Sequence, residues 1–290
     1  MEFSNNRKIL IAGGSGFVGK ALQKTLAQSG FEVVVLPRSV YQGNDNSLKN
    51  LMENVYAVIN LAGAPINSRW TKKSRKEILD SRITATTQLR NAVMLCKNPP
   101  QYFISASAVG IYDTTGVHDE SSDAFSNDFP AEICKSWEAP VEKIKSKTHA
   151  SIVRLGLVLG KDGGTIKKLL PLFKSGLGGK LGSGKQPFPY IHIQDVCKAV
   201  IHILSQSNPS EIYNFTSPQS ITNKDFTRAL AKALHRPSVF FIPSFILKFL
   251  FGKRASMILN GQQVIPRNLL NEGFQFGFAD INHQEFFEFR

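Results

Sequence analysis

The amino-acid sequence predicts an α/β protein: a Rossmann-type, doubly wound parallel sheet with a small C-terminal cap on the substrate side. Two observations carry this prediction. Short apolar runs rich in β-branched residues alternate with helical segments through the first half, which is typical of a parallel sheet covered by helices on both faces. The first of these runs also leads directly into a glycine-rich turn and a helix.

Five runs are predicted as strands of this sheet. They are Lys8 to Ala12, Glu32 to Leu36, Ala57 to Asn60, Tyr102 to Ser105 and Ser151 to Arg154. The helices expected between them are Gly16 to Gln28, Thr71 to Cys96 and Ala131 to Lys147. Asparagine, glycine and serine crowd the segment between Arg38 and Lys49, so the third strand–helix unit should be abbreviated.

Beyond Gly160 the pattern loosens into loops that contain glycine and proline. One further strand is expected at Tyr190 to Ile193, and helices are expected at Asp195 to Leu204, Asn223 to Leu234 and Ser244 to Leu259. We therefore expect residues 1–160 to form the Rossmann domain. Residues 161–290 should form a cap that is intertwined with it and is not an independent domain.

The charge balance points to anions as ligands. Lys and Arg number 35 against 22 Asp and Glu, which gives a formal net charge of +13. The lysines occur singly or in pairs and do not gather with stacking aromatic residues, so we expect no nucleic-acid partner.

Cysteine usage and hydropathy bear on the compartment. Three scattered cysteines do not form a disulfide framework, and no Cys-x-x-Cys pair or His-rich spacing indicates a metal site. The first apolar run is broken at once by glycines, as in a strand, and we expect a cytoplasmic protein. Val239 to Phe251 is interrupted by Pro243 and Lys248 and falls short of the roughly 20 residues of a spanning helix. It is expected to be a core-packing or interfacial helix, and no membrane partner is expected.

The strongest chemical signal is KILIAGGSGFVGKAL, in which three glycines follow the first strand at a spacing of three. Without Cβ atoms, Gly13 and Gly16 let the backbone approach a diphosphate, and Gly19 lets the helix pack on the sheet. The N–H groups and positive dipole end at the helix start favour the same anion. We predict a dinucleotide site at Gly13, Ser15, Gly16, Phe17, Val18 and Gly19. The alternative is an ordinary loop turn.

The end of the second strand indicates which dinucleotide binds. An acid at this place accepts hydrogen bonds from the adenosine ribose, whereas an arginine meets a 2′-phosphate. The sequence VVVLPRS offers Arg38 and no nearby acid, which predicts NADP(H) over NAD(H). The alternative is a solvated arginine at a strand end.

Further motifs accompany the turn in order along the chain. They are NLAG from Asn60, RW from Arg69, SR from Ser81, FISASAVGIY from Phe103, WE from Trp137, RLGLVLG from Arg154, GLGGKLGSGKQ from Gly176, YIHIQD from Tyr190, HRP from His235, GQQVIP from Gly261 and GFQF from Gly273. Together they resemble the extended, atypical short-chain dehydrogenase/reductase superfamily of NAD-dependent epimerases and dehydratases. More narrowly, they resemble its epimerase-family subgroup with a C-terminal domain of unknown function, here at about residues 238–286.

The resemblance implies where the cofactor lies. Leu61, Ala62 and Gly63 would stand near its adenosine half, and the loop after Ser105 would face the nicotinamide. Loops that follow parallel strands line the cofactor cleft of Rossmann folds, which agrees with this placement. Taken alone, NLAG is also compatible with a strand that ends in a turn of small residues.

The resemblance also raises a catalytic question. Active members use a serine that binds the substrate oxygen and a Tyr-x-x-x-Lys helix that exchanges its proton. Ser107, with Ser105 as second choice, stands at the serine position, although a capping or turn hydroxyl is the alternative. Aligning Glu138 with the acidic residue that follows the dyad puts Pro130 at the tyrosine and Cys134 at the lysine.

Neither replacement can exchange a proton or supply a fixed positive charge in the same way. Lys135 is one residue further along, and a helix rotates by about 100° per residue, so this lysine should face elsewhere. Tyr112 and Glu120 are the two candidates to replace the dyad, each with a structural or rim position as the alternative. If the protein is a reductase, we expect its chemistry to depend on Ser107 and Tyr112.

The substrate side departs from the subgroup as well. Where the related pattern reads GSGRQW and SWIHI, this chain reads GSGKQPFPYIHI, and its candidate substrate contacts are Lys185, Gln186 and Tyr190. For the following HxxD stretch we expect structural roles, with Asp195 as a helix N-cap and His192 as a loop anchor. The glycines and lysines of residues 165–185 fit either a mobile lid for an anion or a solvated flexible loop.

The sequence thus predicts an NADP(H)-binding oxidoreductase or epimerase-like enzyme acting on an anionic small molecule. The alternative is a non-catalytic, NADP(H)-dependent binding or regulatory protein. A homodimer through the long helices is expected by analogy with the fold.

Overall fold

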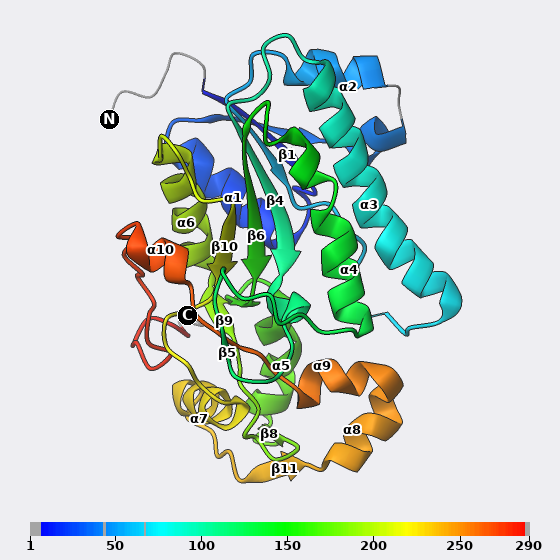
Figure 1. Ribbon diagram of the computed structural model, residues 1–290. Helices are drawn as coiled ribbons and strands as arrows, with labels where there is room; N and C mark the ends of the chain where they lie inside the picture. Colours follow the sequence, from blue (N-terminus) through cyan, green and yellow to red (C-terminus); the bar gives the residue numbers. More distant parts are fainter. Residues whose placement is uncertain (1–6, 43–44, 67, 288–290) are drawn as a thin grey trace.

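The structure, a computed structural model, describes residues 7–42, 45–66 and 68–287. Its centre is a six-stranded sheet in the order β10-β6-β4-β3-β1-β2, and every neighbouring pair is parallel (Figure 1). The strand order reverses between β1 and β3, which is the switch point where doubly wound sheets bind ligands. The predicted fold class is confirmed.

The six strands of the sheet are β1 (Lys8–Ala12), β2 (Glu32–Leu36), β3 (Ala57–Asn60), β4 (Tyr102–Ala108), β6 (His149–Leu155) and β10 (Ile212–Phe215). The first three have the predicted bounds, and β4 and β6 lie where they were predicted but are longer. The strand β10 was not predicted because its run IYNF contains Asn214 among only four residues. It comes from the part of the chain after residue 160, so the cap and the Rossmann layer alternate along the sequence.

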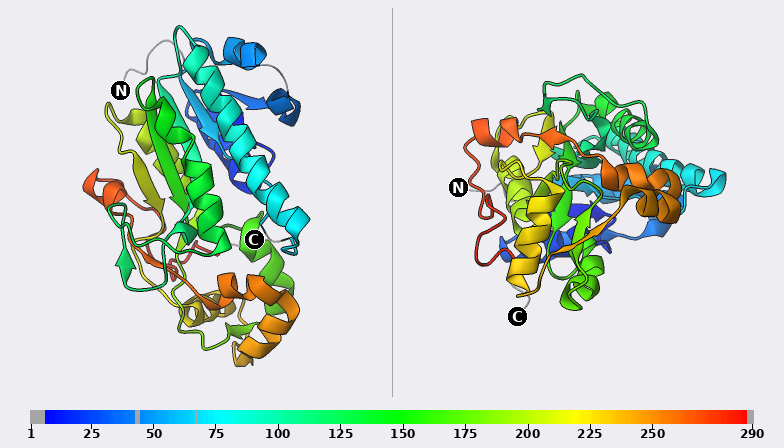
Figure 2. Two further views of the ribbon diagram at one scale, coloured as in Figure 1. Left: turned by 45° about the vertical axis from the view of Figure 1, so that its right-hand side comes forward. Right: turned by 90° about the horizontal axis from the view of Figure 1, so that it is seen from below.

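Helices cover both faces of the sheet (Figures 1 and 2). On one face, α1 (Phe17–Gln28) and α6 (Ile193–Ser205) pack against one cluster of buried strand residues. On the other face, α2 (Asp45–Met52) and α3 (Lys72–Leu95) pack against a second cluster. Alternate residues of β1 point into the two clusters, as the pleat of a strand requires. The helix α4 (Phe129–Glu138) lies beside α3.

Two predicted helices are divided in the structure. Residues Ala131 to Lys147 form all but the first two residues of α4 and then η3 (Val141–Ile144), because Pro140 has no N–H to continue the helix. Residues Ser244 to Leu259 form α8 (Ser244–Phe251), η4 (Gly252–Ala255) and α9 (Ser256–Leu259). Gly252 divides them with a φ of +56°.

The abbreviated third unit is confirmed as η1 (Arg38–Gln42) followed by the short helix α2; residues 43 and 44 lie outside the described residues.

The cap lies at the carboxyl end of the central strands (Figure 2). It contains α5 (Gly164–Lys174), α7 (Asn223–Ala233), α8, α9 and the parallel pair β8 (Gly179–Leu181) and β11 (Phe240–Ile242). Two further pairs join it to the sheet layer: β7 (Leu157–Leu159) with β9 (Tyr190–His192), and β5 (Val117–His118) with β12 (Gln263–Val264). The chain then forms α10 (Arg267–Asn271). Over the described ranges, no helix combines the length and the apolar character needed to cross a membrane.

Candidate functional site

The glycine turn after β1 is built by close backbone packing. Gly13 has a φ of +77°, and a Cβ atom there would lie 2.6 Å from the carbonyl of Leu61. A Cβ atom on Gly19 would lie 2.7 Å from the Cα of Gly14, so α1 approaches the turn as only glycine allows. The Gln23 amide donates hydrogen bonds to the carbonyls of Gly14 and Gly19, at 2.7 and 3.1 Å. No motif in the sequence indicates this role of Gln23.

The start of α1 is open to an anion. Gly16 is its N-cap and offers no side-chain acceptor, and the first turn carries no acidic residue. The first N–H groups of a helix have no intrahelical acceptor, so they are available to a ligand. A Cβ atom on Gly16 would meet only the Gly13 carbonyl, at 3.5 Å, and Ser15 is exposed beside it. The residues of the turn therefore fit a dinucleotide diphosphate.

Phe17 connects the turn to the cap. A Cβ atom on Gly163 would lie 2.3 Å from its ring, and one on Gly160 would lie 2.9 Å from it. The ring thus fills the space that side chains would occupy between β7 and α5, while Val18 beside it faces the sheet core. A packing role accounts for Phe17 and Val18 without side-chain contact to a cofactor.

Arg38 lies at the same edge of the sheet. The strands β1 and β2 are paired in register from Lys8 with Glu32 to Ala12 with Leu36, so the glycine turn and the Pro37–Arg38 segment leave neighbouring strands at the same level. The Arg38 side chain is exposed, and the next acidic residue in the sequence is Asp45. This position suits a phosphate on an adenosine ribose.

The end of β3 is fixed by Asn60, which is fully buried. Its amide donates to Thr86 Oγ1 at 2.8 Å and to Ser105 Oγ at 3.1 Å, and its carbonyl oxygen accepts from the Ala62 N–H. The predicted residues Leu61, Ala62 and Gly63 follow directly, with Gly63 exposed. Ser105 is 1% exposed and supports this turn, which is a structural use of its hydroxyl.

Ser107 is part of a network of hydrogen-bonded polar side chains near the carboxyl ends of the central strands. Its hydroxyl donates to Glu138 Oε1 at 2.5 Å, and Glu138 accepts two hydrogen bonds from Arg154, at 3.0 and 2.9 Å. Arg154 Nη1 donates to the Tyr112 hydroxyl at 2.8 Å, which donates to Asn214 Oδ1 at 3.0 Å. Five segments of the chain therefore meet in one hydrogen-bonded network. The WE motif does not predict this central role of Glu138.

Tyr112 and Glu120 occupy structural positions. Tyr112 is 0% exposed, stacks on His118 with ring centroids 5.0 Å apart, and has a pKa raised by burial. Glu120 accepts hydrogen bonds from the backbone N–H groups of Asn214, Arg267 and Asn268, so it holds α10 against β10. For both residues, the geometry favours the structural alternative over contact with a substrate.

The α4 helix presents no cation at its buried face. Cys134 is buried, its thiol points at the Ala108 carbonyl at 3.5 Å, and burial raises its pKa to about 12. Lys135 is exposed and donates to the Ser126 carbonyl at 2.9 Å, so it faces away as its helical position predicts. Pro130 lies in the first turn of the helix, after the N-cap Asp128.

Arg82 brings a positive charge to this region from α3. A Cβ atom on Gly63 would lie 2.9 Å from its guanidinium carbon, and Nη1 donates to the carbonyls of Ala64 and Ile78. The guanidinium also lies 4.8 Å from the centre of the Trp137 ring. Its Nε is buried and has no hydrogen-bond partner within the described structure. The SR motif contains Arg82, but the spacing of the motif does not predict that its side chain turns toward Gly63.

The predicted substrate contacts separate in the structure. Lys185 is exposed, but the Gln186 amide donates to the carbonyls of Leu181 and Ile258 and thereby holds α9 to the loop. Tyr190 is 1% exposed, and its hydroxyl donates to Gln219 at 2.7 Å. Burial therefore favours structural roles for Gln186 and Tyr190.

The expectation for the HxxD stretch was partly wrong. His192, and not Asp195, is the N-cap of α6, with its ring accepting from the Gln194 N–H. Asp195 is the third residue of the helix, in its first turn, and its carboxylate accepts from the N–H groups of Gly277 and Phe278 at 2.8 and 2.9 Å. It holds the C-terminal segment, a long-range role that local spacing does not reveal.

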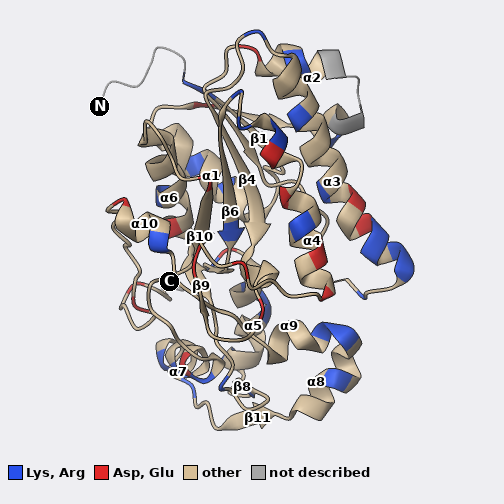
Figure 3. Ribbon diagram, viewed as in Figure 1, with Lys and Arg blue, Asp and Glu red and all other residues tan. Residues whose placement is uncertain are grey.

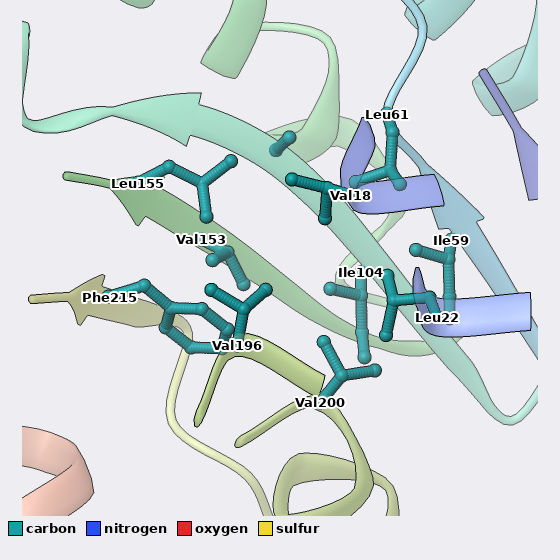
Figure 4. A pocket seen from close by; sticks show the side chains of 11 residues that line it. Val18, Leu22, Ile59, Leu61, Ile104, Val153, Leu155, Val196, Val200 and Phe215 are labelled. Carbon is teal, nitrogen blue, oxygen red and sulfur yellow. The ribbon is translucent and has the colours of Figure 1, made fainter. Parts of the chain in front are cut away.

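Two cavities differ in kind. One is an apolar void of about 10 Å³ between α1, α6 and the sheet, with room for about one water molecule (Figure 4). The other is an open cleft of about 550 Å³ between the segment before α3 and the cap. It is lined by Arg69, Trp70, Phe249, Leu250, Phe251, Gly252, Lys253 and Arg254. Only the second can hold a small organic anion.

Comparisons with known proteins cover most of the chain. Residues 9–215 match the profile of the NAD dependent epimerase/dehydratase family, and residues 242–283 match a domain of unknown function. The bovine epimerase family protein SDR39U1 is 36% identical over 94% of this chain and 97% of its own length. A chloroplastic homologue from Arabidopsis thaliana is 33% identical over 94% of this chain and 84% of its own length.

Solved structures agree with these matches. The human SDR39U1 structure with NADPH has a TM-score of 0.90 at 34% identity and covers 96% of this chain and 98% of that one. UDP-glucuronic acid 4-epimerase from Bacillus cereus, in complex with UDP-glucuronic acid and NAD, has a TM-score of 0.75 at 18% identity, over 96% and 97% of the two chains. The second likeness concerns the fold alone.

Proposed function

The chain belongs to the NAD dependent epimerase/dehydratase family, in the subgroup with a C-terminal domain of unknown function, and from this premise we propose an NADP(H)-dependent oxidoreductase or epimerase-like enzyme that acts on an anionic small molecule. The observation that carries the proposal is the open start of α1 beside an exposed arginine. There the N–H groups of the first turn can hold the diphosphate, and Arg38 can hold a 2′-phosphate.

The choice of NADP(H) over NAD(H) rests on Arg38. It follows β2 with no acid in the next six residues, so the strand end offers a cation and no carboxylate to a ribose. The human relative was solved with NADPH, which supports the same choice, whereas the more distant 4-epimerase was solved with NAD.

When bound, the nicotinamide would accept a hydride from a carbinol carbon or donate one to a carbonyl carbon, and the chain must move the matching proton. Ser107 lies near the carboxyl end of β4, and its hydroxyl already donates to Glu138 at 2.5 Å. A substrate hydroxyl that donates to Ser107 Oγ would thus pass its proton through the serine to the Glu138 carboxylate. Arg154 binds both oxygens of that carboxylate and keeps it oriented.

Arg82 would supply the positive charge that Cys134 does not. It lies against Gly63, which follows β3 at the cofactor edge, and its Nε has no partner within the described residues. A partly buried guanidinium in this place can hold ribose or nicotinamide oxygens, the task that the superfamily gives to a lysine.

The cleft before α3 is the proposed substrate site. Arg69, Lys253 and Arg254 surround it with positive charge, and Trp70 with Phe249 to Phe251 supplies apolar walls. The expected substrate therefore combines an anionic group with an apolar or ring-shaped body. Lys185 remains a candidate for a further anion contact from the cap.

Titration with NADPH and NADH tests the cofactor proposal. The wild-type protein should bind NADPH more tightly, and Arg38→Ala should weaken NADPH binding by about 10- to 100-fold while NADH binding stays within about twofold. Lys24→Ala is the matched control. It removes an exposed cation on α1 and should change neither the NADPH nor the NADH affinity. Equal affinities for both dinucleotides in the wild type would remove the proposed preference.

A non-catalytic binding or regulatory protein is the second candidate, and the sealed network favours it. Ser107 is 1% exposed and Tyr112 is 0% exposed, so neither hydroxyl is open to solvent. A panel of carbonyl compounds and sugar nucleotides separates the two functions. Cofactor oxidation that Ser107→Ala abolishes supports the enzyme, and NADPH binding at one equivalent without turnover supports the binding protein.

A cytoplasmic location and a homodimer complete the proposal. The free, buried thiols of Cys96, Cys134 and Cys197 support a reducing compartment. The dimer rests on analogy with the fold, with α3 and α4 as its expected interface.

A further inference from the structure

A group of exposed apolar side chains gathers on the cap, along β11, α8 and the start of α9. The exposed fractions include 78% for Val239, 70% for Phe245, 89% for Phe249 and 61% for Leu250. We call this group the apolar patch; it comprises Val239, Phe240, Phe241, Phe245, Phe249, Leu250, Phe251 and Met257. A water-soluble surface rarely exposes so many large apolar residues together without a partner.

The geometry of α8 accounts for the exposure. Only Leu247 of its eight residues is buried, although six of the eight residues in SFILKFLF are apolar. Phe245 and Phe249 are four residues apart, so they project from the same side of the helix. Figure 1 shows α8 and β11 together at the end of the molecule opposite α2.

The charges around the apolar patch have one sign. The sequence contains no Asp or Glu between Asp225 and Glu272. Lys248, Lys253 and Arg254 lie within or next to the patch, and Lys180 of β8 lies 6.0 Å from the centre of the Phe241 ring. Figure 3 shows blue bands on α8 and the turn after it, and no red on α8 or α9.

These observations select one occupant. A second copy of the chain would bring like charges together, which opposes self-association through this patch. Exposed Phe and Leu bordered by Lys and Arg are typical of segments that lie in the interface of an anionic bilayer.

We propose that the apolar patch docks on the surface of an anionic lipid bilayer. The phenylalanines of β11 and α8 enter the boundary between headgroups and acyl chains, and Lys248, Lys253 and Arg254 contact lipid phosphates. Residues 249–254 also line the proposed substrate cleft, so lipid and substrate compete for these side chains. This binding is peripheral and crosses no membrane. It replaces the expectation of no membrane partner, which considered spanning helices, and develops the expectation that Val239 to Phe251 is interfacial.

Flotation of the full-length chain with vesicles tests the proposal. The protein should bind phosphatidylcholine vesicles weakly and should bind vesicles that also contain phosphatidylglycerol about 100-fold more tightly, because three cations face the headgroups. The double variant Phe245→Ser/Phe249→Ser should lose about 100-fold of that binding. Lys248→Glu/Lys253→Glu should lose the preference for phosphatidylglycerol.

Matched controls separate docking from general surface effects. Leu95→Ser removes an apolar side chain that is 49% exposed at the end of α3, and Lys24→Glu reverses an exposed charge on α1. Both should bind vesicles as the wild type does. Because all the altered side chains are exposed, every variant should melt within a few degrees of the wild type.

Two results would overturn the proposal. One is equal flotation of the wild type and Phe245→Ser/Phe249→Ser, or no flotation of either at low salt. The other is a concentration-dependent dimer, measured by light scattering, that Phe249→Ser dissociates. That result would assign the patch to a second copy of the chain.

Discussion

The glycine turn at α1 and the polar network at α4 lie at the same edge of one sheet, and they are built in opposite ways. The turn is made of backbone: Gly13 and Gly19 leave no room for a Cβ atom, and the start of α1 presents N–H groups. The network is made of side chains from five segments, with Arg154 and Glu138 at its centre.

The difference shows which part of the site can accept a ligand: the glycine turn, which we call the cofactor half, or the polar network, which we call the catalytic half. A diphosphate needs donors that the main chain always carries, so the turn tolerates only glycines at its contact points. Proton transfer needs an ionisable atom at one position, and here the hydroxyls of Ser107 and Tyr112 are already bonded to neighbours. The cofactor half is open to a ligand, whereas the catalytic half is closed around an ion pair.

Glu138→Gln should have the largest effect, because it leaves Arg154 charged and unpaired. The two side chains are 11% and 4% exposed, and breaking such a buried pair costs about 3–5 kcal/mol. The free energy of unfolding in urea measures this loss. Affinity for NADPH, measured on protein that is still folded, should change little, which would confirm that the two halves are separate.

The double variant Glu138→Leu/Arg154→Met is the control for Glu138→Gln. It removes both charges and keeps apolar volume, so it should recover most of the lost stability. A double variant less stable than Glu138→Gln would contradict the view that an unpaired charge causes the loss.

Gly13→Ala should lower stability by about 2–5 kcal/mol and abolish NADPH binding. The left-handed backbone costs about 1–2 kcal/mol for alanine, and the contact with the Leu61 carbonyl adds an overpacking cost. Gly116→Ala is the matched control, because Gly116 has the same φ of +77° and no atom within 4 Å of its Cβ position. Gly116→Ala should lose only the stability that the left-handed backbone costs and should keep full affinity for NADPH. Equal losses in the two variants would show that the approach to Leu61 is not tight.

Tyr112→Phe should cost about 1–3 kcal/mol of stability and leave any cofactor oxidation unchanged. It deprives Arg154 and Asn214 of one hydrogen bond each in a buried place. Tyr56→Phe, which deletes a buried hydroxyl bonded to the Leu204 carbonyl, is the control and should cost about as much. A large fall in turnover with Tyr112→Phe, but not with Tyr56→Phe, would show that the Tyr112 hydroxyl takes part in catalysis.

The sequence predicted what local pattern determines. The strand starts at Lys8, Glu32 and Ala57 and the span of α1 follow from apolar runs and glycine positions, and the structure has them within one residue. Thr71 begins α3 by a capping box with Ser74, which is also a local signal. The breaks at Pro140 and Gly252 were missed, although both residues are known to end helices.

Long-range contacts explain what the sequence did not predict. Asp195 binds the backbone 82 residues away at Gly277, Glu120 binds it at Asn268, and Arg82 turns toward Gly63 from another element. No spacing along the chain encodes such partners. The candidate cofactor positions at the glycine turn therefore lie together at one edge of the sheet. By contrast, the candidate catalytic residue Tyr112 and the candidate substrate residue Tyr190 are buried, and the Gln186 amide is hydrogen-bonded within the protein.

The smallest expected effect concerns Cys134, which stands where the superfamily has a lysine. Burial raises the pKa of its thiol from 9.0 to about 12, so the folded protein keeps it neutral while the unfolded chain ionises it above pH 9. The wild type should therefore lose stability between pH 8 and pH 10 by about 1 kcal/mol more than Cys134→Ala does. Denaturant unfolding of both proteins at the two pH values gives this difference, in which the other two thiols cancel. An identical pH dependence would mean that Cys134 ionises in the folded state, and the catalytic half would then contain a reactive thiolate after all.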